Sequence, residues 1–200
     1  KDYGVDEAEA IMAGFLEPQD LCVRVNTSKI TREDLVKNLE ESGVKVRICD
    51  SLDSALYISG YDSLASLDAF KKGLFYVQDY SSQLVPKLAG VKATDHIIDV
   101  CSAPGGKALH CGELASDGLV VARDLTDAKV SLIQENINRT GATNVTAVKW
   151  DATVLDEDAV RKYDIVIADL PCSGLGIIRK KPDIKYNQTE DTLAELVALQ

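Results

Sequence analysis

Cysteine and histidine are scarce in this chain of 200 residues. Its five cysteines, an odd number, form no C-x-x-C pair, and the spacing of its two histidines matches no metal site. These absences argue against a disulfide framework or a zinc centre, and they indicate reduced thiols in a cytoplasmic protein. No apolar run reaches the length of a membrane span, and residues 1–4 lack the shape of a signal peptide. We therefore expect no membrane partner.

Basic charge is also in short supply. The chain has 22 Lys and Arg against 32 Asp and Glu, and the net charge of −10 argues against a broadly basic nucleic-acid binder. The exception is a basic patch, opposed only by Asp183, that consists of Arg179, Lys180, Lys181 and Lys185. Such a run is often a solvated surface, but its position shortly after a strand end at Asp169 favours contact with a substrate.

Residues 1–72 have the pattern of a small α+β module. The predicted elements are a helix over 6–16, a strand over 21–25, a helix from Thr31 to Gly43, and strands over 44–48 and 55–59. Thr31 is followed three residues later by Asp34, a spacing that resembles a capping box. Pro18 follows the end of the first helix, and Gly43 stops the second.

From residue 73 to residue 200 the pattern becomes one of strands alternating with helices. The predicted strands cover 75–77, 96–100, 119–122, 145–148 and 165–168, and the predicted helices cover 81–88, 108–114 and the segment from Asp127, as cap, to Gly141. This alternation predicts an α/β fold class, a doubly wound, Rossmann-like sheet with right-handed crossovers.

A small turn after the strand at 96–100 is the strongest indication of function. It consists of Cys101, Ser102, Ala103, Pro104, Gly105, Gly106 and Lys107, and a helix follows. Glycine lets the backbone approach a ligand closely, and the start of a helix presents unpaired N–H groups and a positive dipole end. The turn lacks the G-x-G-x-x-G spacing of a pyrophosphate binder, which favours S-adenosylmethionine over NAD as the cofactor.

Three acidic residues follow strands of the same predicted sheet. In open parallel sheets, ligands bind outside the carboxyl ends of the strands. We expect Asp124 to meet the hydroxyls of a ribose and Asp151 to reach an adenine amino group, while Asp169 ends the fourth strand. A single acid at a strand end is usually a helix cap or a turn former, but three beside one glycine turn favour a cofactor site.

Cys172 has the most reactive setting of the five cysteines, because it follows Pro171 at a strand end and lies close to Asp169 in sequence. Three others, Cys22, Cys49 and Cys111, are predicted to be small buried hydrophobes. Cys101 is expected to line the cofactor through its backbone while its thiol stays inert.

Two motifs, Asp99–Lys107 and Asp169–Gly174, resemble those of the Sun/Fmu (NOL/NOP/Sun) RNA cytosine-C5 methyltransferases. The flanking stretches 21–27, 77–83 and 179–185 strengthen the resemblance, and the last is most similar to the bacterial small-subunit ribosomal RNA members. The resemblance implies a methyltransferase sheet in which residues 101–107 bind the methyl donor with Asp124, Asp151 and Asp169. It also implies that the module before residue 72 binds RNA, with ribosomal RNA favoured and transfer RNA left open.

The resemblance further implies a covalent mechanism. Cytosine carbon 5 is a poor nucleophile until a thiolate adds to carbon 6, and the base must be unstacked to be reached. By resemblance, Cys172 assists product release, and the attacking thiol belongs to a Thr-Cys-Ser motif further along the family's sequences. No such motif occurs before Gln200. We therefore expect a truncated sheet, in a fragment that holds the donor and RNA sites but does not complete the reaction.

Three alternatives stay open at this point. In DNA cytosine methyltransferases the Pro-Cys cysteine is itself the nucleophile, which would make Cys172 sufficient. A non-catalytic RNA-binding protein could keep the same fold. An amino methyltransferase would have a Pro-Pro-aromatic sequence at the strand end, and Pro171-Cys172 argues against that alternative. Arg123 is a bulky, charged residue at a position beside Asp124 where we expect a smaller one.

Overall fold

The computed structural model describes residues 3–16 and 19–200, apart from the side chains of Lys185 and Asn187. It divides into a larger unit, Asp20–Asp169, and a smaller unit made of Lys1–Gln19 and Leu170–Gln200. Across the described ranges, no helix combines the length and the apolar character that a membrane crossing requires.

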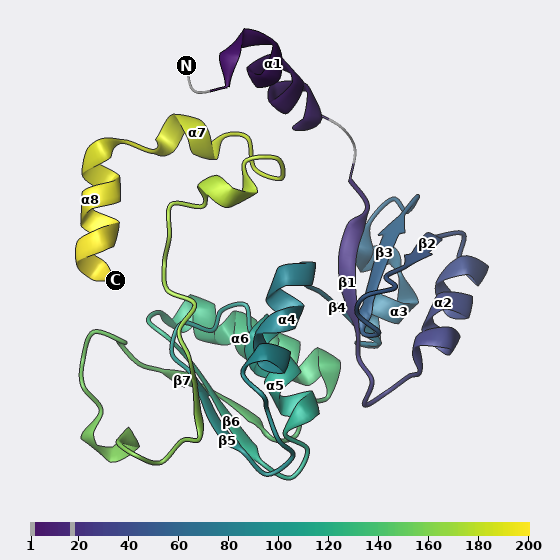
Figure 1. Cartoon of the computed structure of the whole chain (residues 1–200). Coiled ribbons are helices and arrows are strands. Elements are labelled where there is room, and N and C mark those ends of the chain that lie inside the picture. Colours follow the sequence, from purple (N-terminus) through teal and green to yellow (C-terminus); the bar gives the residue numbers. More distant parts are fainter. Residues whose placement is uncertain (1–2, 17–18) are drawn as a thin grey trace. The chain divides into compact units, whose positions relative to one another are not determined.

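The larger unit begins with a four-stranded antiparallel sheet, here called the first sheet. Its strands are β1 (Leu21–Val25), β2 (Lys45–Ile48), β3 (Ala55–Ser59) and β4 (Phe75–Val77), in the order β2-β3-β1-β4 (Figure 1). The helices α2 (Arg32–Glu41) and α3 (Asp68–Lys71) belong to the same region, where Leu35 and Leu39 of α2 and Phe75 of β4 are fully buried in one apolar cluster. The predicted cap is confirmed, because the Thr31 side chain accepts a hydrogen bond from the Asp34 amide.

The sequence pattern assigns the strand at 75–77 to the alternating region, and that assignment is wrong. The structure pairs β4 with β1 in the first sheet, with Val25 opposite Phe75 and Val23 opposite Val77. The physical reason is the burial of the Phe75 ring among the side chains of the first sheet and α2. A three-residue strand carries too short a pattern to show which sheet it joins.

The second sheet is parallel, as predicted. Its strands are β5 (His96–Asp99), β6 (Leu119–Asp124), β7 (Val145–Lys149) and β8 (Ile165–Ile167), in the order β7-β6-β5-β8. The chain passes from β4 to β5 through α4 (Tyr80–Leu88), from β5 to β6 through α5 (Gly106–Leu114), and from β6 to β7 through α6 (Asp127–Thr140) (Figure 1). This arrangement confirms a Rossmann-like α/β sheet preceded by a small α+β module. Thr126, not Asp127, caps α6, because the Thr126 hydroxyl accepts from the Lys129 amide.

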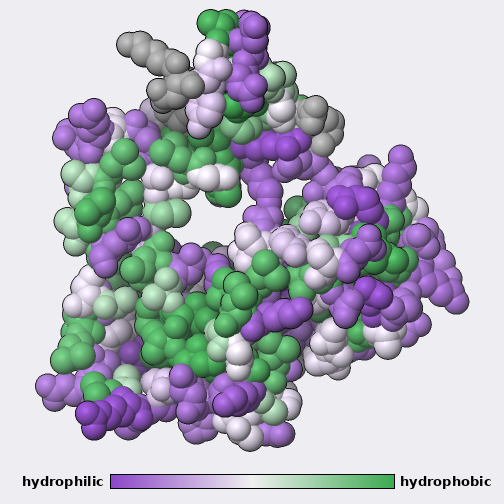
Figure 2. Space-filling model, viewed as in Figure 1, coloured by the Kyte–Doolittle hydropathy of each residue, from purple (hydrophilic) through white to green (hydrophobic). Residues whose placement is uncertain are grey.

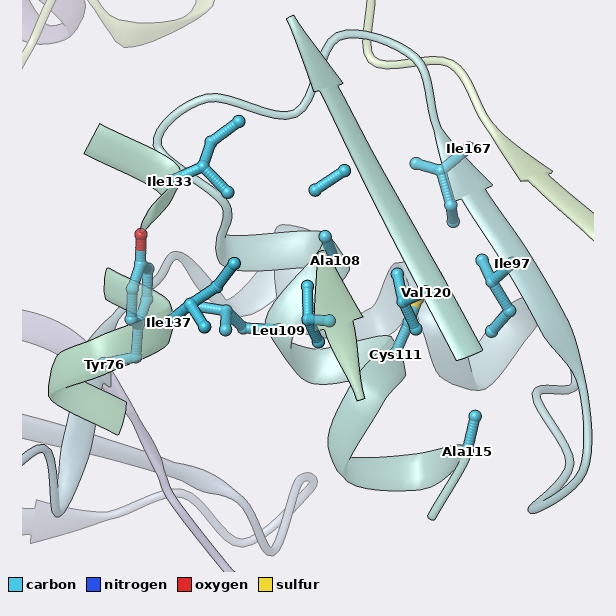
Figure 3. Close-up of a cluster of buried hydrophobic side chains, with 12 residues drawn as sticks. Tyr76, Ile97, Ala108, Leu109, Cys111, Ala115, Val120, Ile133, Ile137 and Ile167 are labelled. Atoms are coloured by element: carbon cyan, nitrogen blue, oxygen red, sulfur yellow. The ribbon is translucent and has the colours of Figure 1, made fainter. Parts of the chain in front are cut away.

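The core of the second sheet joins side chains of all four strands to α5 and α6. Figure 3 shows Leu109 of α5 near Ile137 of α6, and Val120 of β6 near Cys111 of α5, with Ile97 and Ile167 of the neighbouring strands close by. Two small residues, Ala108 of α5 and Ala115 directly after it, are fully buried in the same cluster. Small side chains let the helix approach the sheet closely, so this packing fixes where α5 begins and ends.

The smaller unit contains α1 (Gly4–Gly14), α7 (Ile184–Asn187) and α8 (Glu190–Leu199). The predicted helix over 6–16 is confirmed as α1, although it begins and ends two residues earlier, and Pro18 lies outside the described residues. A reciprocal pair of bonds between Thr189 and Thr192 caps α8. None of the described residues of this unit is buried.

Candidate functional site

The turn between β5 and α5, residues 101–106, is here called the glycine turn. Gly105 has a φ of +103°, a conformation that side-chain-bearing residues rarely adopt, and its amide donates to the Ser102 carbonyl at 2.7 Å. A Cβ at Gly105 would lie 3.4 Å from the Ile133 side chain. The sequence therefore places glycine where the chain must both reverse and pass close to α6.

The strand order brings the predicted acidic residues to one edge of the second sheet. All four strands are parallel, so their carboxyl ends share an edge, along which the order β7-β6-β5-β8 places Asp151, Asp124, the glycine turn and Asp169. The sequence pattern predicted this grouping. What each acid does there differs from one to the next.

Asp124 holds the glycine turn. Its carboxylate accepts from the amides of Ala103 (2.9 Å) and Leu125 (2.8 Å), and Lys129 Nζ lies 2.9 Å from Oδ1. Burial works against the charge, but the two backbone bonds and Lys129 hold the pKa of Asp124 below its usual range. The carboxylate is charged and buried, and it ties the end of β6 to the turn after β5.

Asp169 pairs with Lys107, because Lys107 Nζ donates to Asp169 Oδ2 at 2.5 Å. The Lys107 side chain is 18% exposed, whereas that of Asp169 is 61% exposed. The ion pair links the first turn of α5 to the end of β8. It places an accessible carboxylate beside the glycine turn.

Asp151 behaves as the turn former that the sequence left open as an alternative. Its Oδ1 accepts from the Thr153 amide at 3.0 Å and from the Thr153 hydroxyl at 2.7 Å, and these bonds lower the pKa of Asp151. The side chain is exposed. A contact with adenine therefore stays a prediction for this residue.

Asp99 and the Ser102 hydroxyl form the most unusual part of the site, and Asp99 was not among the residues predicted from sequence. Both are buried, and within the described part of the chain neither Asp99 Oδ1 nor Ser102 Oγ has a hydrogen-bond partner. Burial raises the pKa of Asp99 to about 6; the nearby Ser102 hydroxyl opposes that shift without making a bond of regular geometry. The available signal was an acid at the end of an apolar strand.

Arg123 faces away from Asp124, as alternate residues of a strand do. Its guanidinium bonds to Asp156 and lies 4.8 Å from the Trp150 ring. It lines a groove of about 350 Å³ on the other face of the sheet, together with Ile98 and Val166. Figure 2 shows apolar side chains gathered over β5, β6 and β7. The bulk of Arg123 is thus accommodated in this groove.

The four cysteines of the larger unit have structural settings. Cys22, Cys49 and Cys111 are buried as predicted, and burial raises the pKa of Cys111 to about 12. Burial, helped by Asp124, also raises the pKa of Cys101, in agreement with an inert thiol. In the described ranges, no three His, Cys, Asp or Glu side chains are grouped to hold a metal ion.

Cys172 and the basic patch belong to the smaller unit. The Cys172 thiol is exposed, and the neighbouring Pro171 carbonyl accepts from the Gln200 side chain at 2.6 Å. Lys180 and Lys181 are exposed, and Arg179 is half-buried. The Lys185 side chain lies outside the described residues. The roles given to these residues stay predictions.

Comparison with known proteins gives two family matches. Residues 87–200 match the family described as 16S rRNA methyltransferase RsmB/F, and residues 1–63 match the ferredoxin-like domain described as Methyltr_RsmF/B-like. The chain is 36% identical over 200 residues to the probable ribosomal RNA small subunit methyltransferase B of Bacillus subtilis (strain 168), covering 99% of this chain and 44% of that protein. It therefore spans less than half the length of this curated relative.

Two solved structures are similar over most of the chain. The crystal structure of PH0851 superposes with a TM-score of 0.90 at 28% identity, covering 97% of this chain and 44% of that one. NSun6 from Pyrococcus horikoshii, solved with SFG, has a TM-score of 0.76 at 26% identity, covering 85% of this chain and 68% of that one.

Proposed function

Because the chain belongs to the 16S rRNA methyltransferase RsmB/F family, we propose that it carries the donor site and RNA contacts of an S-adenosylmethionine-dependent enzyme. The reaction we propose is methyl transfer to carbon 5 of a cytosine in ribosomal RNA. The observation that carries the proposal is the carboxyl edge of the second sheet, where a glycine turn, Asp124 and two unsatisfied buried oxygens meet.

The residues at this edge fit a methyl donor that has amino, carboxylate and hydroxyl groups. Asp99 Oδ1 and Ser102 Oγ are buried polar atoms without partners in the described chain, so a ligand there would satisfy them. The glycine turn offers backbone groups at close approach, and Asp124 keeps that turn in place. When bound, S-adenosylmethionine would supply an electrophilic methyl group at this edge.

The proposed chemistry on the RNA side needs a thiol. Carbon 5 of cytosine becomes nucleophilic only when a thiolate has added to carbon 6, and the adduct must later be released. We assign Cys172 to that release step. Its exposed thiol in a Pro-Cys pair supports the assignment, and the attacking thiol is assigned to a Thr-Cys-Ser motif outside this sequence.

Ribosomal RNA is the proposed substrate, and transfer RNA is the alternative. The name of the Bacillus subtilis relative supports the first. Exposed Lys180 and Lys181, with Arg179 and Lys185, would contact phosphates in a protein that is otherwise acidic. The module before residue 72 is proposed to contribute to RNA binding as well.

A calorimetric comparison of cofactors tests the proposal. The purified chain is titrated with S-adenosylmethionine, S-adenosylhomocysteine and NAD in separate runs. We expect saturable binding of the first two at one site and none of NAD, because the turn lacks a diphosphate-binding spacing. Binding of NAD alone would contradict the proposed function.

A further inference from the structure

A buried arginine of the first sheet binds the helix that follows the glycine turn. Arg24 lies on β1 and is fully buried. Its Nη1 donates to the Gly106 carbonyl at 2.9 Å and also to Gln78 Oε1, and its Nη2 bonds to Glu113 Oε1 at 2.7 Å. Gly106 begins α5 and Glu113 lies near its end, so one guanidinium fixes the helix at two points on one face.

Tyr76 of β4 and the neighbouring Gln78 also lie against the same turn. The Tyr76 hydroxyl donates to the Pro104 carbonyl at 3.0 Å. A Cβ at Gly106 would come within 3.1 Å of the Tyr76 ring and 3.6 Å of the Gln78 side chain. The first sheet therefore forms the wall behind the glycine turn, and the turn has no room to move toward it.

Burying the charges of the Arg24–Glu113 pair costs free energy, so a contribution to stability alone does not explain the pair well. Burial raises the pKa of Glu113 even though Arg24 opposes the shift. Well-packed apolar residues in place of a buried ion pair are often neutral or stabilising. The chain also joins the first sheet to α6 without charge, because Asn26 Nδ2 donates to the carbonyls of Gly73 (2.8 Å) and Thr140 (3.0 Å).

We propose that Arg24 is a positioning residue for the methyl donor. From the first sheet it holds Gly106 and, with Tyr76, the whole glycine turn in the shape that receives the donor. Donor affinity then depends on a side chain of the first sheet that does not itself touch the donor. The inference rests on the proposed function, since it assigns the donor to this turn.

The decisive variant removes both charges at once, Arg24→Met with Glu113→Leu, so that no unpaired ion is left buried. The matched control is Asn26→Ala, which cuts an uncharged link between the first sheet and α6. We expect the double variant to keep its melting temperature within a few degrees but to bind S-adenosylhomocysteine at least tenfold more weakly. The control should melt earlier and keep the wild-type affinity. Arg24→Lys should fall between, because one ammonium cannot reach both Gly106 and Glu113.

A second readout needs no donor. Amide hydrogen exchange at residues 102–106, measured by mass spectrometry, should accelerate in the double variant and stay unchanged in Asn26→Ala. Wild-type affinity in the double variant, or equal loss of affinity in the control, would overturn the role of Arg24. Absence of binding by the wild type would contradict the proposed function instead, and hydrogen exchange would still decide whether Arg24 fixes the turn. If the double variant does not fold, Tyr76→Phe carries the test, with a several-fold loss of affinity expected and an unchanged affinity overturning the proposal.

Discussion

The two units of this chain hold their candidate functional residues in different ways. In the larger unit, Asp124 and Asp99 are buried beside a continuous apolar core, and most of their surroundings are fixed by hydrogen bonds or packing. In the smaller unit no described residue is buried, and Cys172, Lys180 and Lys181 are exposed. The difference indicates that the donor site is preformed, whereas Cys172 and the basic patch lie on a part whose described residues form no core.

The largest expected effect is the one predicted for Cys172. If it is not observed, the comparison between the two units no longer holds. The present chain should methylate no RNA, because the thiol that attacks carbon 6 is assigned to a motif outside it. In a full-length protein, Cys172→Ala should still form the covalent adduct but release it poorly, so that an enzyme–RNA conjugate accumulates on a denaturing gel. Cys22→Ala, which changes a buried thiol, is the control.

Two outcomes would contradict that assignment. Turnover by the present chain, abolished in Cys172→Ala, would make Cys172 the nucleophile, as in the DNA enzymes. A full-length Cys172→Ala protein that forms no conjugate would lead to the same conclusion.

A substitution at Asp99 tests whether the candidate donor site lowers the stability of the larger unit. The pKa of Asp99 is about 6 in the fold, above its value in an unfolded chain, so the folded state binds the proton more tightly. This contribution to stability is complete below about pH 4 and is lost as the pH rises through 6. Asp99→Asn should therefore be more stable than wild type at pH 7, by about 2–3 kcal/mol, and should bind S-adenosylhomocysteine more weakly. Urea denaturation at pH 4 and pH 7 measures the first effect; a variant that is less stable at pH 7 would contradict it.

The contribution of His110 to stability has the opposite dependence on pH. It gives a second test of how a buried ionisable group affects the stability of the larger unit. It is buried on α5, and burial, with Arg24 nearby, lowers its pKa to about 3. The unfolded state binds this proton more tightly, so stability falls as the pH drops below about 6.5. Near pH 5 the loss is about 2 kcal/mol. His110→Gln should remove that loss, as followed by melting temperature at pH 5 and pH 7.5, whereas exposed His96→Gln should leave it unchanged.

The basic patch of the smaller unit should give the smallest effect. Lys180→Glu with Lys181→Glu should weaken RNA binding and flatten its dependence on salt, by roughly one unit of slope for each phosphate that the variant no longer neutralises. Lys92→Glu with Lys162→Glu makes the same change of charge at exposed positions of the larger unit, outside the module before residue 72. Equal slopes for the two double variants would show that only net charge matters and that the patch binds no phosphate directly.

The sequence predicted the elements that carry strong local signals. The apolar run into a glycine turn, the Thr31 cap and the stop at Gly141 each have a local physical cause, and all three occur in the structure. Strand β4 shows the limit, because three residues do not reveal their sheet and only the burial of Phe75 among distant side chains decides it.

The site could be located from sequence but its inner contacts could not. The strand-end pattern brought Asp124, Asp151 and Asp169 to one edge, yet their bonding partners depend on tertiary geometry: Asp124 on Ala103, and Asp169 on Lys107. Arg24 and Asp99 were missed as site residues because a charge within an apolar strand gives no local sign of its partner. Burying a charge needs compensation, which Glu113 supplies for Arg24.

The central claim, that the carboxyl edge of the second sheet binds the methyl donor, is tested most directly at Asp124. Isothermal titration with S-adenosylhomocysteine compares the wild-type chain with Asp124→Ala and with Asp62→Ala, a change of an exposed acid. We predict that Asp124→Ala weakens binding by about 1–3 kcal/mol. The glycine turn loses its hydrogen bond to the Asp124 carboxylate, and ribose hydroxyls lose a charged acceptor. Asp62→Ala should bind as the wild type does. Unchanged affinity in Asp124→Ala, with the fold intact by circular dichroism, would contradict the claim.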